Sequence, residues 1–365
     1  MMRKTVVTLG LAFVFLAALG PKAGAQTNGV DFTLTGNPNL QALMTATGMS
    51  QTDIENFMRG KLDQLFQATN AASFIRNFGD AQSFTSKGMG VDYASEATYF
   101  EVGGSASFAL GIDRTYQPGS TQGFPIQGVG LNASVMAGAN LQYFVKIPLM
   151  VFGNWMQVPT QHYGDMSGSL DNWGVHAQLR LWGPDRKTTV LKALVRWGGI
   201  AITSGFDSSH MGLGVSHDVK SSFSLPSNTI PNGVDVDVTG TAGGTARFNI
   251  DMTTRSIPVE VTTSVRLLSL VTAYGGMGFD WQLGGGSNLD LRMNASMLGQ
   301  VGNQSLDLGT ATVHATANVA PSPAKIRGIL GAQVNLWLLR IFAQLNAANT
   351  NPVMASVAAG VRFAY

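Results

Sequence analysis

The last thirteen residues of the chain alternate between two kinds of side chain, and this pattern constrains the fold more than any other feature. Every second position from Val353 to Phe363 is apolar, whereas the positions between are mostly small or polar and include one charge, Arg362. Successive side chains of a strand point to opposite faces. A strand between lipid and an aqueous lumen needs this composition. The segment therefore predicts one wall strand of a transmembrane β-barrel.

The same alternation recurs over residues 99–365 and predicts an all-β fold. The predicted strands are 100–112, 129–137, 141–151, 173–181, 191–197, 257–267, 271–281, 289–297, 306–316, 326–334, 339–345 and 353–365. Most are near the ~9 to 11 residues that a tilted membrane strand needs. Charged residues make up only 12% of the chain, about half the share of a soluble domain. A soluble β-sandwich would instead show both sheet faces partly polar.

The sequence thus predicts a transmembrane antiparallel barrel of about twelve strands, whose connections alternate between long and short. The longest connection, residues 206–254, is predicted to be an extracellular loop. It also contains two strand-like pieces, residues 211–225 and 245–252. If these pieces belong to the wall, the barrel has fourteen strands.

The N-terminus predicts export. Arg3 and Lys4 precede an apolar stretch from Val6 to Leu19, and the small residues Ala23-Gly24-Ala25 form a cleavage site. This is the pattern of a Sec-type signal peptide over residues 1–25, which leaves Gln26 as the first mature residue. The chain has no cysteine, so export brings neither disulfides nor a lipid anchor.

Residues 26–98 precede the barrel and are predicted to hold one helix. Ser50 and Asp53 have the spacing of a capping box, and apolar residues then recur at helical spacing as far as Phe66. Residues 73–95 are rich in glycine and serine and are predicted to be irregular. Two interpretations remain open for this segment: a plug inside the barrel lumen, or a cap in the periplasm.

If the apolar faces contact lipid, the charges on the opposite faces line the lumen. The candidate lumen-lining residues are Glu101, Lys146, His176, Arg180, Lys192, Arg196, Glu260, Arg266, Asp280, Asp290, Arg292, Arg327, Arg340 and Arg362. Nine of them are basic and four are acidic, which favours anionic solutes. The alternative is that paired charges only fill and brace the interior.

Enzyme chemistry is not expected, and no catalytic, cofactor or metal site is predicted. The five histidines show no spacing typical of a metal site. Ser208, Ser209 and His210 are adjacent in the chain, which is not the geometry of a catalytic triad. A net charge of +2 is too small to indicate a nucleic-acid partner.

The terminal Phe363-x-Tyr365 resembles the C-terminal assembly signal of Gram-negative outer-membrane β-barrel proteins. The resemblance implies the bacterial outer membrane as location, and outer-membrane lipid and the barrel-assembly machinery as partners. The N-terminal helical segment is similar to that of hatch-bearing barrels such as the long-chain fatty-acid transporters.

Three functions are compatible with these features. The first is a passive channel or transporter for small, anionic or amphiphilic solutes. The second is a surface-adhesion or structural barrel that uses residues 206–254 for contact. The third is an outer-membrane lipid hydrolase.

Overall fold

The structure is a computed structural model, and it describes residues 27–48, 50–68, 71–94, 97–112, 127–183, 194–225, 238–301 and 304–365. The predicted signal peptide, residues 1–25, lies outside this part of the chain. Among the described residues, no helix is both long and apolar enough to cross a membrane.

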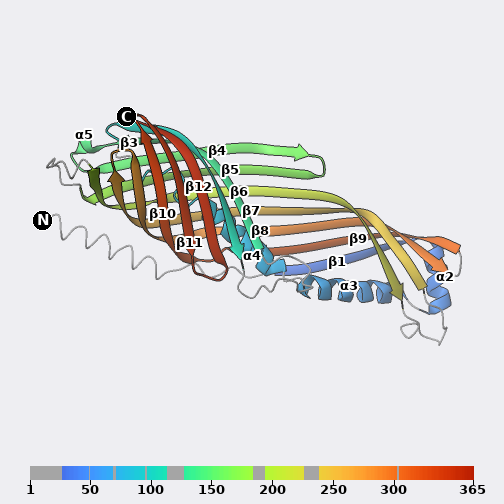
Figure 1. The fold of residues 1–365 in the computed structure, drawn as a ribbon. Helices are drawn as coiled ribbons and strands as arrows, with labels where there is room; N and C mark the ends of the chain where they lie inside the picture. The colour runs from blue at the N-terminus through green and yellow to red at the C-terminus, as the bar shows by residue number, and fades with distance from the viewer. Residues whose placement is uncertain are drawn as a thin grey trace.

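In the part of the chain that the structure describes, twelve strands form one antiparallel sheet (Figure 1). The strands are β1 (Thr27–Gly36), β2 (Phe100–Ile112), β3 (Gln127–Asn140), β4 (Leu149–Tyr163), β5 (Met166–Trp182), β6 (Val195–Leu225), β7 (Val238–Leu267), β8 (Val271–Val301), β9 (Gln304–Val319), β10 (Ala324–Leu336), β11 (Leu339–Ala348) and β12 (Val353–Ala364). The helices are α2 (Pro38–Thr47), α3 (Gln51–Ala68), α4 (Ala71–Thr85) and α5 (Gln142–Val145). The prediction of an antiparallel barrel is confirmed, and its sheet has twelve strands, ten of which close the ring.

Strand β8 both closes the ring and carries the sheet beyond it. Its first half pairs with β7 on one side and β10 on the other, which completes the circuit β2–β3–β4–β5–β6–β7–β8–β10–β11–β12. Its second half pairs with β9, which in turn pairs with β1. The long strands β6, β7 and β8 thereby leave the ring together and form, with β9 and β1, a sheet that we call the extension (Figure 1).

The ring is apolar outside and polar inside. On β12, Val357 is 54% exposed on the outer face, whereas Ser356 and Arg362 on the inner face are 3% and 1% exposed. Val175 and His176 on β5 show the same contrast. A soluble sheet would hide its apolar face, so this arrangement indicates lipid around the ring. The ring is that of an outer-membrane β-barrel.

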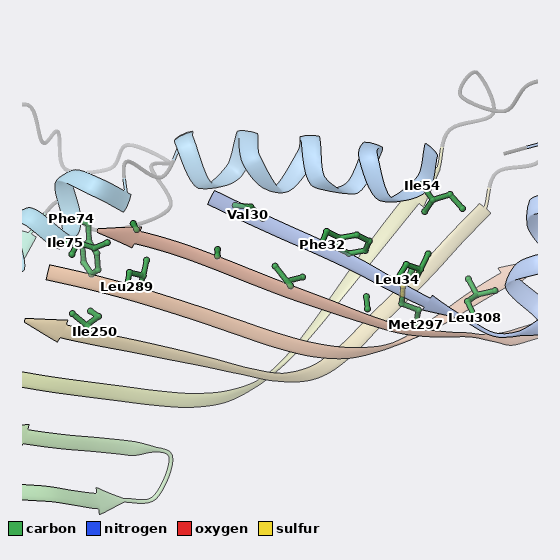
Figure 2. Packing of buried hydrophobic residues seen from close by; sticks show 14 of the residues in the cluster. Val30, Phe32, Leu34, Ile54, Phe74, Ile75, Ile250, Leu289, Met297 and Leu308 are labelled. Atoms are coloured by element: carbon green, nitrogen blue, oxygen red, sulfur yellow. The ribbon is translucent and has the colours of Figure 1, made fainter. Parts of the chain in front are cut away.

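The extension has the opposite polarity. On β7, Ile250 and Met252 are buried on the face continuous with the lumen, whereas Asp251 is exposed on the other face. The buried residues pack against β1 and against Ile54 of α3, as Figure 2 shows. The inner face therefore has a core of its own, and the outer face is suited to water. The outer face of the sheet therefore passes from lipid to water along the length of single strands.

Exposed aromatic residues mark the two limits of the apolar band. Trp182, Trp197 and Trp337 lie at the end of the ring where the chain terminates, and Trp155 and Trp173 pair across β4 and β5 at the other limit. Trp173 and Trp182 belong to one strand; their separation corresponds to roughly 30 Å along it. A strand tilt of about 40° reduces this to roughly 23 Å of membrane depth.

The predicted helix is confirmed as α3, together with its capping box. The backbone N–H of Ser50 donates to the Asp53 carboxylate (2.9 Å), and the N–H of Asp53 donates to the Ser50 hydroxyl (3.2 Å). The hydrogen bonds from Ser50 also hold the pKa of the exposed Asp53 carboxyl below its ordinary value.

Several predicted boundaries are wrong. Residues 141–148 form a turn around α5 rather than a strand, and β4 and β5 meet in a tight hairpin at Gly164 rather than in a long loop. The predicted strands 271–281 and 289–297 are one strand, β8, because the glycine-rich 283–288 forms a register shift rather than a loop. The predicted loop 206–254 is mostly strand, since β6 and β7 continue through it as far as residues 225 and 238.

The N-terminal region holds more regular structure than predicted. Residues 73–85 are not irregular, because they belong to α4, whereas residues 86–94 are irregular as predicted. The polar residues of α4 find partners on the wall, which local glycine and serine content does not reveal. Strand β1 was not predicted, although Val30, Phe32 and Leu34 alternate within it.

We expect Phe32→Ala to loosen the extension and leave the ring intact. Phe32 is 3% exposed in the extension core, and such truncations cost about 3–5 kcal/mol. Limited proteolysis in detergent should show faster cleavage of the variant within residues 206–301. The unheated variant should still migrate on a gel at the position of the folded protein. The control is Thr33→Ala on the exposed face of the same strand. Equal resistance of Phe32→Ala and the unaltered protein would contradict the assignment of a separate core.

Candidate functional site

The lumen of the ring is occupied by the chain itself. Helix α4 starts beside the extension, where Phe74 and Ile75 join its core. The chain then runs along the inside of the ring, and all residues from 79 to 94 are buried. At the far end the N–H of Tyr99 donates to the carbonyl of Tyr365 (2.7 Å), beside the start of β2. We call residues 77–94 the lumen segment.

Charged side chains bind the first part of the lumen segment, residues 80–87, to the wall. The Asp80 carboxylate accepts hydrogen bonds from Lys325 (2.8 Å) and from the hydroxyl of Ser322 (2.6 Å). Lys87 lies 3.2 Å from Asp207 and donates to Ser256 (2.5 Å). Each of these charges is nearly or fully buried.

The second part of the lumen segment, residues 91–93, is bound in the same way. The Asp92 carboxylate lies 2.9 Å from Arg362, which also donates to the carbonyl of Val91 (2.7 Å). The Tyr93 hydroxyl donates to Glu260 (2.5 Å). The lumen segment is therefore attached by side chains to β6, β7, β10 and β12, and within the described residues it adds no strand to the wall.

A buried charge cluster supports these contacts from the wall. Arg327 is 1% exposed and is paired with Glu260 and with Asp280, the latter at 2.9 Å. It also donates to the side-chain oxygen of Asn346 (2.9 Å). Buried ions are costly unless partners and further hydrogen bonds compensate them. Here the wall and the lumen segment share one network, because Glu260 also accepts from Tyr93.

The predicted lumen-lining residues fall into three groups. Six are buried on the inner face of the ring: Glu101, His176, Glu260, Asp280, Arg327 and Arg362. Four lie on the inner face at the end where the chain terminates: Arg180, Arg196, Arg266 and Arg340. Of the rest, Lys192 lies outside the described residues, and three are elsewhere.

Lys146, Asp290 and Arg292 do not line the lumen. Lys146 is exposed in the turn after α5. Asp290 and Arg292 are on the water-facing side of the extension, 2.9 Å apart, with His314 3.1 Å from Asp290. They were misplaced because the apolar face of this segment packs against protein and not against lipid.

The basic end of the ring encloses a polar cavity of about 190 Å³. Arg180 and Arg196 line it together with Gln178 and Tyr93. Arg196 lies directly opposite Arg266 in the β6–β7 ladder. Like charges directly opposite each other in a ladder are unfavourable.

Asp80, Lys87, Asp92 and Tyr93 were not among the predicted site residues. The sequence contains a signal for three of them, because Asp80, Lys87 and Asp92 are isolated charged residues in a stretch of mostly small and apolar residues. Such isolated charges indicate burial against a partner once a polar lumen is expected.

The residues examined for enzyme chemistry are not brought together. Ser208 and His210 belong to the outer face of β6, whereas Ser209 is buried inside and accepts a hydrogen bond from Gln82 (2.9 Å). The described residues contain no group of three or more potential metal ligands.

We expect Arg327→Met to destabilise the ring by about 3–5 kcal/mol, because Glu260 and Asp280 would remain buried and unpaired. Urea unfolding in vesicles, followed by tryptophan fluorescence, measures this. The triple variant with Glu260→Gln and Asp280→Asn should recover most of the loss. Arg292→Met, whose side chain is 64% exposed, is the control and should leave stability unchanged. Equal effects of the two single substitutions would refute the cluster's role.

Comparison with solved structures finds other barrels. The translocator domain of the autotransporter NalP from Neisseria meningitidis is 14% identical with a TM-score of 0.32, and the match covers 81% of this chain and 97% of that one. A Pseudomonas aeruginosa FadL homologue is 6% identical with a TM-score of 0.25, covering 79% and 98%. The CymD monoaromatic hydrocarbon channel is 7% identical with a TM-score of 0.24, covering 80% and 98%. Scores this low carry no argument about function.

No curated protein matches the chain. The model of the Lsa36-like family, however, matches residues 39–365, which include the helices, the lumen segment and the whole ring. The chain therefore belongs to the Lsa36-like family.

Proposed function

We propose that this protein resides in the bacterial outer membrane and passes small solutes through a lumen that the lumen segment closes. The observation that carries the proposal is the way this segment is held. Its contacts with the ring include ion pairs and hydrogen bonds to side chains, among them Lys87–Asp207 and Asp92–Arg362. Such contacts can exchange for water, so the segment can move without breaking the wall.

The orientation of the barrel follows from the lengths of its connections. In outer-membrane barrels, short turns face the periplasm. The tight turns at Ser269 and Trp337 lie at the same end as Tyr365. We place that end in the periplasm and the extension outside, although the tight hairpin at Gly164 also lies on the extension side. Phe363 and Tyr365 are 55% and 57% exposed at the periplasmic end, where the barrel-assembly machinery would bind them.

Anionic solutes fit the periplasmic end best. Four basic residues, Arg180, Arg196, Arg266 and Arg340, lie together on the inner face at this end. An excess of fixed positive charge raises the local concentration of anions.

We expect the unaltered protein to conduct poorly in planar bilayers, and the double variant Lys87→Gln/Asp92→Asn to open more often, by at least about tenfold in open time. Losing two ion pairs weakens the attachment of the lumen segment. The control is Arg292→Gln on the water-facing side of the extension. In the open variant, Arg180→Gln and Arg196→Gln should move the reversal potential in a KCl gradient away from anion selectivity. A double variant that stays closed would refute transport through this lumen.

A second candidate function is a surface platform. The polarity of the extension favours it, because its outer face carries exposed polar and charged residues such as Asp251 and Arg292. With α2 and α3, the extension forms a folded body outside the ring.

This orientation is testable with single cysteines, since the chain has none of its own. A membrane-impermeant maleimide added to intact cells should label Ala42→Cys, on the exposed side of α2, and not Ser269→Cys, in the turn between β7 and β8. Both should react once the outer membrane is permeabilised. The reverse labelling pattern would show that the extension faces the periplasm.

A further inference from the structure

Two β-bulges interrupt the wall of the ring at its periplasmic end. The pairing of β5 with β6 skips Leu181, and the pairing of β6 with β7 skips Gly198. A skipped residue shifts the register by one, which exchanges the two faces for all residues beyond it. Bulges are common at the rims of barrels and beside functional sites, where they redirect a side chain. Here each bulge closely follows an arginine of the inner face, Arg180 in β5 and Arg196 in β6.

The bulge in β5 turns a tryptophan away from the lumen. The inner-face residues of β5 have even numbers, as the buried His176 and Gln178 do. Unbroken alternation would therefore direct Trp182 into the lumen behind Arg180. Because the ladder skips Leu181, Trp182 is instead 60% exposed on the outer face, where tryptophan suits the membrane interface.

The bulge in β6 brings an arginine into the lumen. The inner-face residues of β6 beyond the bulge have odd numbers, as the buried Thr203 and Asp207 do. Unbroken alternation would place Trp197 inside and direct Arg196 toward lipid. Because the ladder skips Gly198, Trp197 lies outside, 46% exposed, and Arg196 lines the polar cavity. Two bulges thus leave two arginines, and no tryptophan, facing one cavity.

The charges of this cavity favour a carboxylate. Among the described lining residues, Arg180 and Arg196 are basic and Asp92 is acidic, so the lining has one positive charge in excess. The Asp92 carboxylate is moreover paired with Arg362, 2.9 Å away. A guanidinium group presents a planar fork of N–H donors that matches the two oxygens of a carboxylate.

Neutral polar groups complete the cavity and favour a hydroxylated ligand. Thr262 and Ser264 of β7 and Gln178 of β5 line it, and all three are buried. Hydroxyl and amide side chains both donate and accept hydrogen bonds, as the hydroxyls of a ligand require. Gly198 and Gly199 also line the cavity, and without side chains they let a ligand approach the backbone closely. The volume of about 190 Å³ limits the ligand to a small molecule.

We propose that this cavity binds a small carboxylate that carries several hydroxyl groups, such as a sugar acid. Its carboxylate pairs with Arg180 and Arg196, and its hydroxyls bind Gln178, Thr262 and Ser264. The inference rests on the proposed transport function and names a class of solute for it. A neutral sugar would leave the arginines without an anion, and an acyl chain would leave the buried hydroxyl and amide groups without partners.

Three probes test the ligand class on the unaltered protein. Isothermal titration calorimetry with the full mature protein in nanodiscs compares D-glucuronate with D-glucose, which lacks the charge, and with hexanoate, which lacks the hydroxyls. Glucuronate should bind at least about tenfold more tightly than either of the others. Equal binding of glucose or of hexanoate would overturn the proposal, as would the absence of glucuronate binding.

Substitutions in the cavity locate the site. Arg180→Gln and Arg196→Gln should each weaken glucuronate binding at least about tenfold, because each removes a charged fork of donors. Ser264→Ala should weaken it several-fold by removing one hydroxyl partner. The matched control is Arg292→Gln, which removes an arginine on the water-facing side of the extension and should leave binding unchanged. Unaltered affinity in both cavity arginine variants would overturn the site.

Two further measurements keep these outcomes distinct. The unheated variants should migrate on a gel as folded protein, and if an arginine variant does not, the three probes on the unaltered protein still decide the ligand class. Conductance separates the site from transport. If Lys87→Gln/Asp92→Asn stays closed while the unaltered protein binds glucuronate, the cavity stands as a binding site and the channel does not. If that variant conducts and glucuronate neither binds the unaltered protein nor reduces the current, the channel stands and the ligand assignment fails.

Discussion

Hydrocarbon offers no hydrogen-bond partner to a peptide group, and the architecture of this protein follows from that constraint. Every sheet edge inside the bilayer must be paired or covered. Strand β8 satisfies this requirement by pairing with β10 over its first half, which closes the ring. The ladder between β3 and β4 stops at Trp155, at the limit of the apolar band, and beyond it Gln82 and Asn172 bind two backbone groups of β3. Outside the bilayer the constraint is relaxed, and within the described residues the extension ends at β1, where side chains of α3 bind the backbone of Leu34.

The lipid around the ring also determines where the charged residues lie. Because the apolar faces contact lipid, the charges must lie inside, where they are stable only in pairs. Arg327 illustrates the consequence, since it pairs with Glu260 and Asp280 while Glu260 also accepts from Tyr93. The closed state of the lumen and the stability of the wall thereby depend on one set of charges. This coupling explains how a segment far from β10 in sequence is held in a defined place.

The parts of the site that sequence predicted are those governed by a single strand's alternation. Glu101, Glu260, Asp280 and Arg362 were assigned to the inner face because each alternates with apolar neighbours that reach lipid. Asp80, Lys87 and Asp92 were missed, since their position depends on contacts with β6, β10 and β12 and not on their own neighbours. The end of the β3–β4 ladder at Trp155 was also beyond prediction, because strand periodicity says nothing about where two strands separate.

By itself the sequence determined that residues 99–365 form an antiparallel sheet with two unlike faces, that its last strand carries lipid-facing residues ending on two aromatics, and that a capped helix precedes it. Only the tertiary structure decided which medium covers each apolar face. Leu289 and Leu330 occupy equivalent positions in alternating strands, yet Leu289 is 1% exposed beneath β1 and α3 whereas Leu330 is 64% exposed on the ring. Alternation reports that two faces differ in polarity. Whether lipid or protein covers the apolar face depends on elements distant in the chain. The same elements determine where, partway along β6, β7 and β8, the outer face passes from lipid to water.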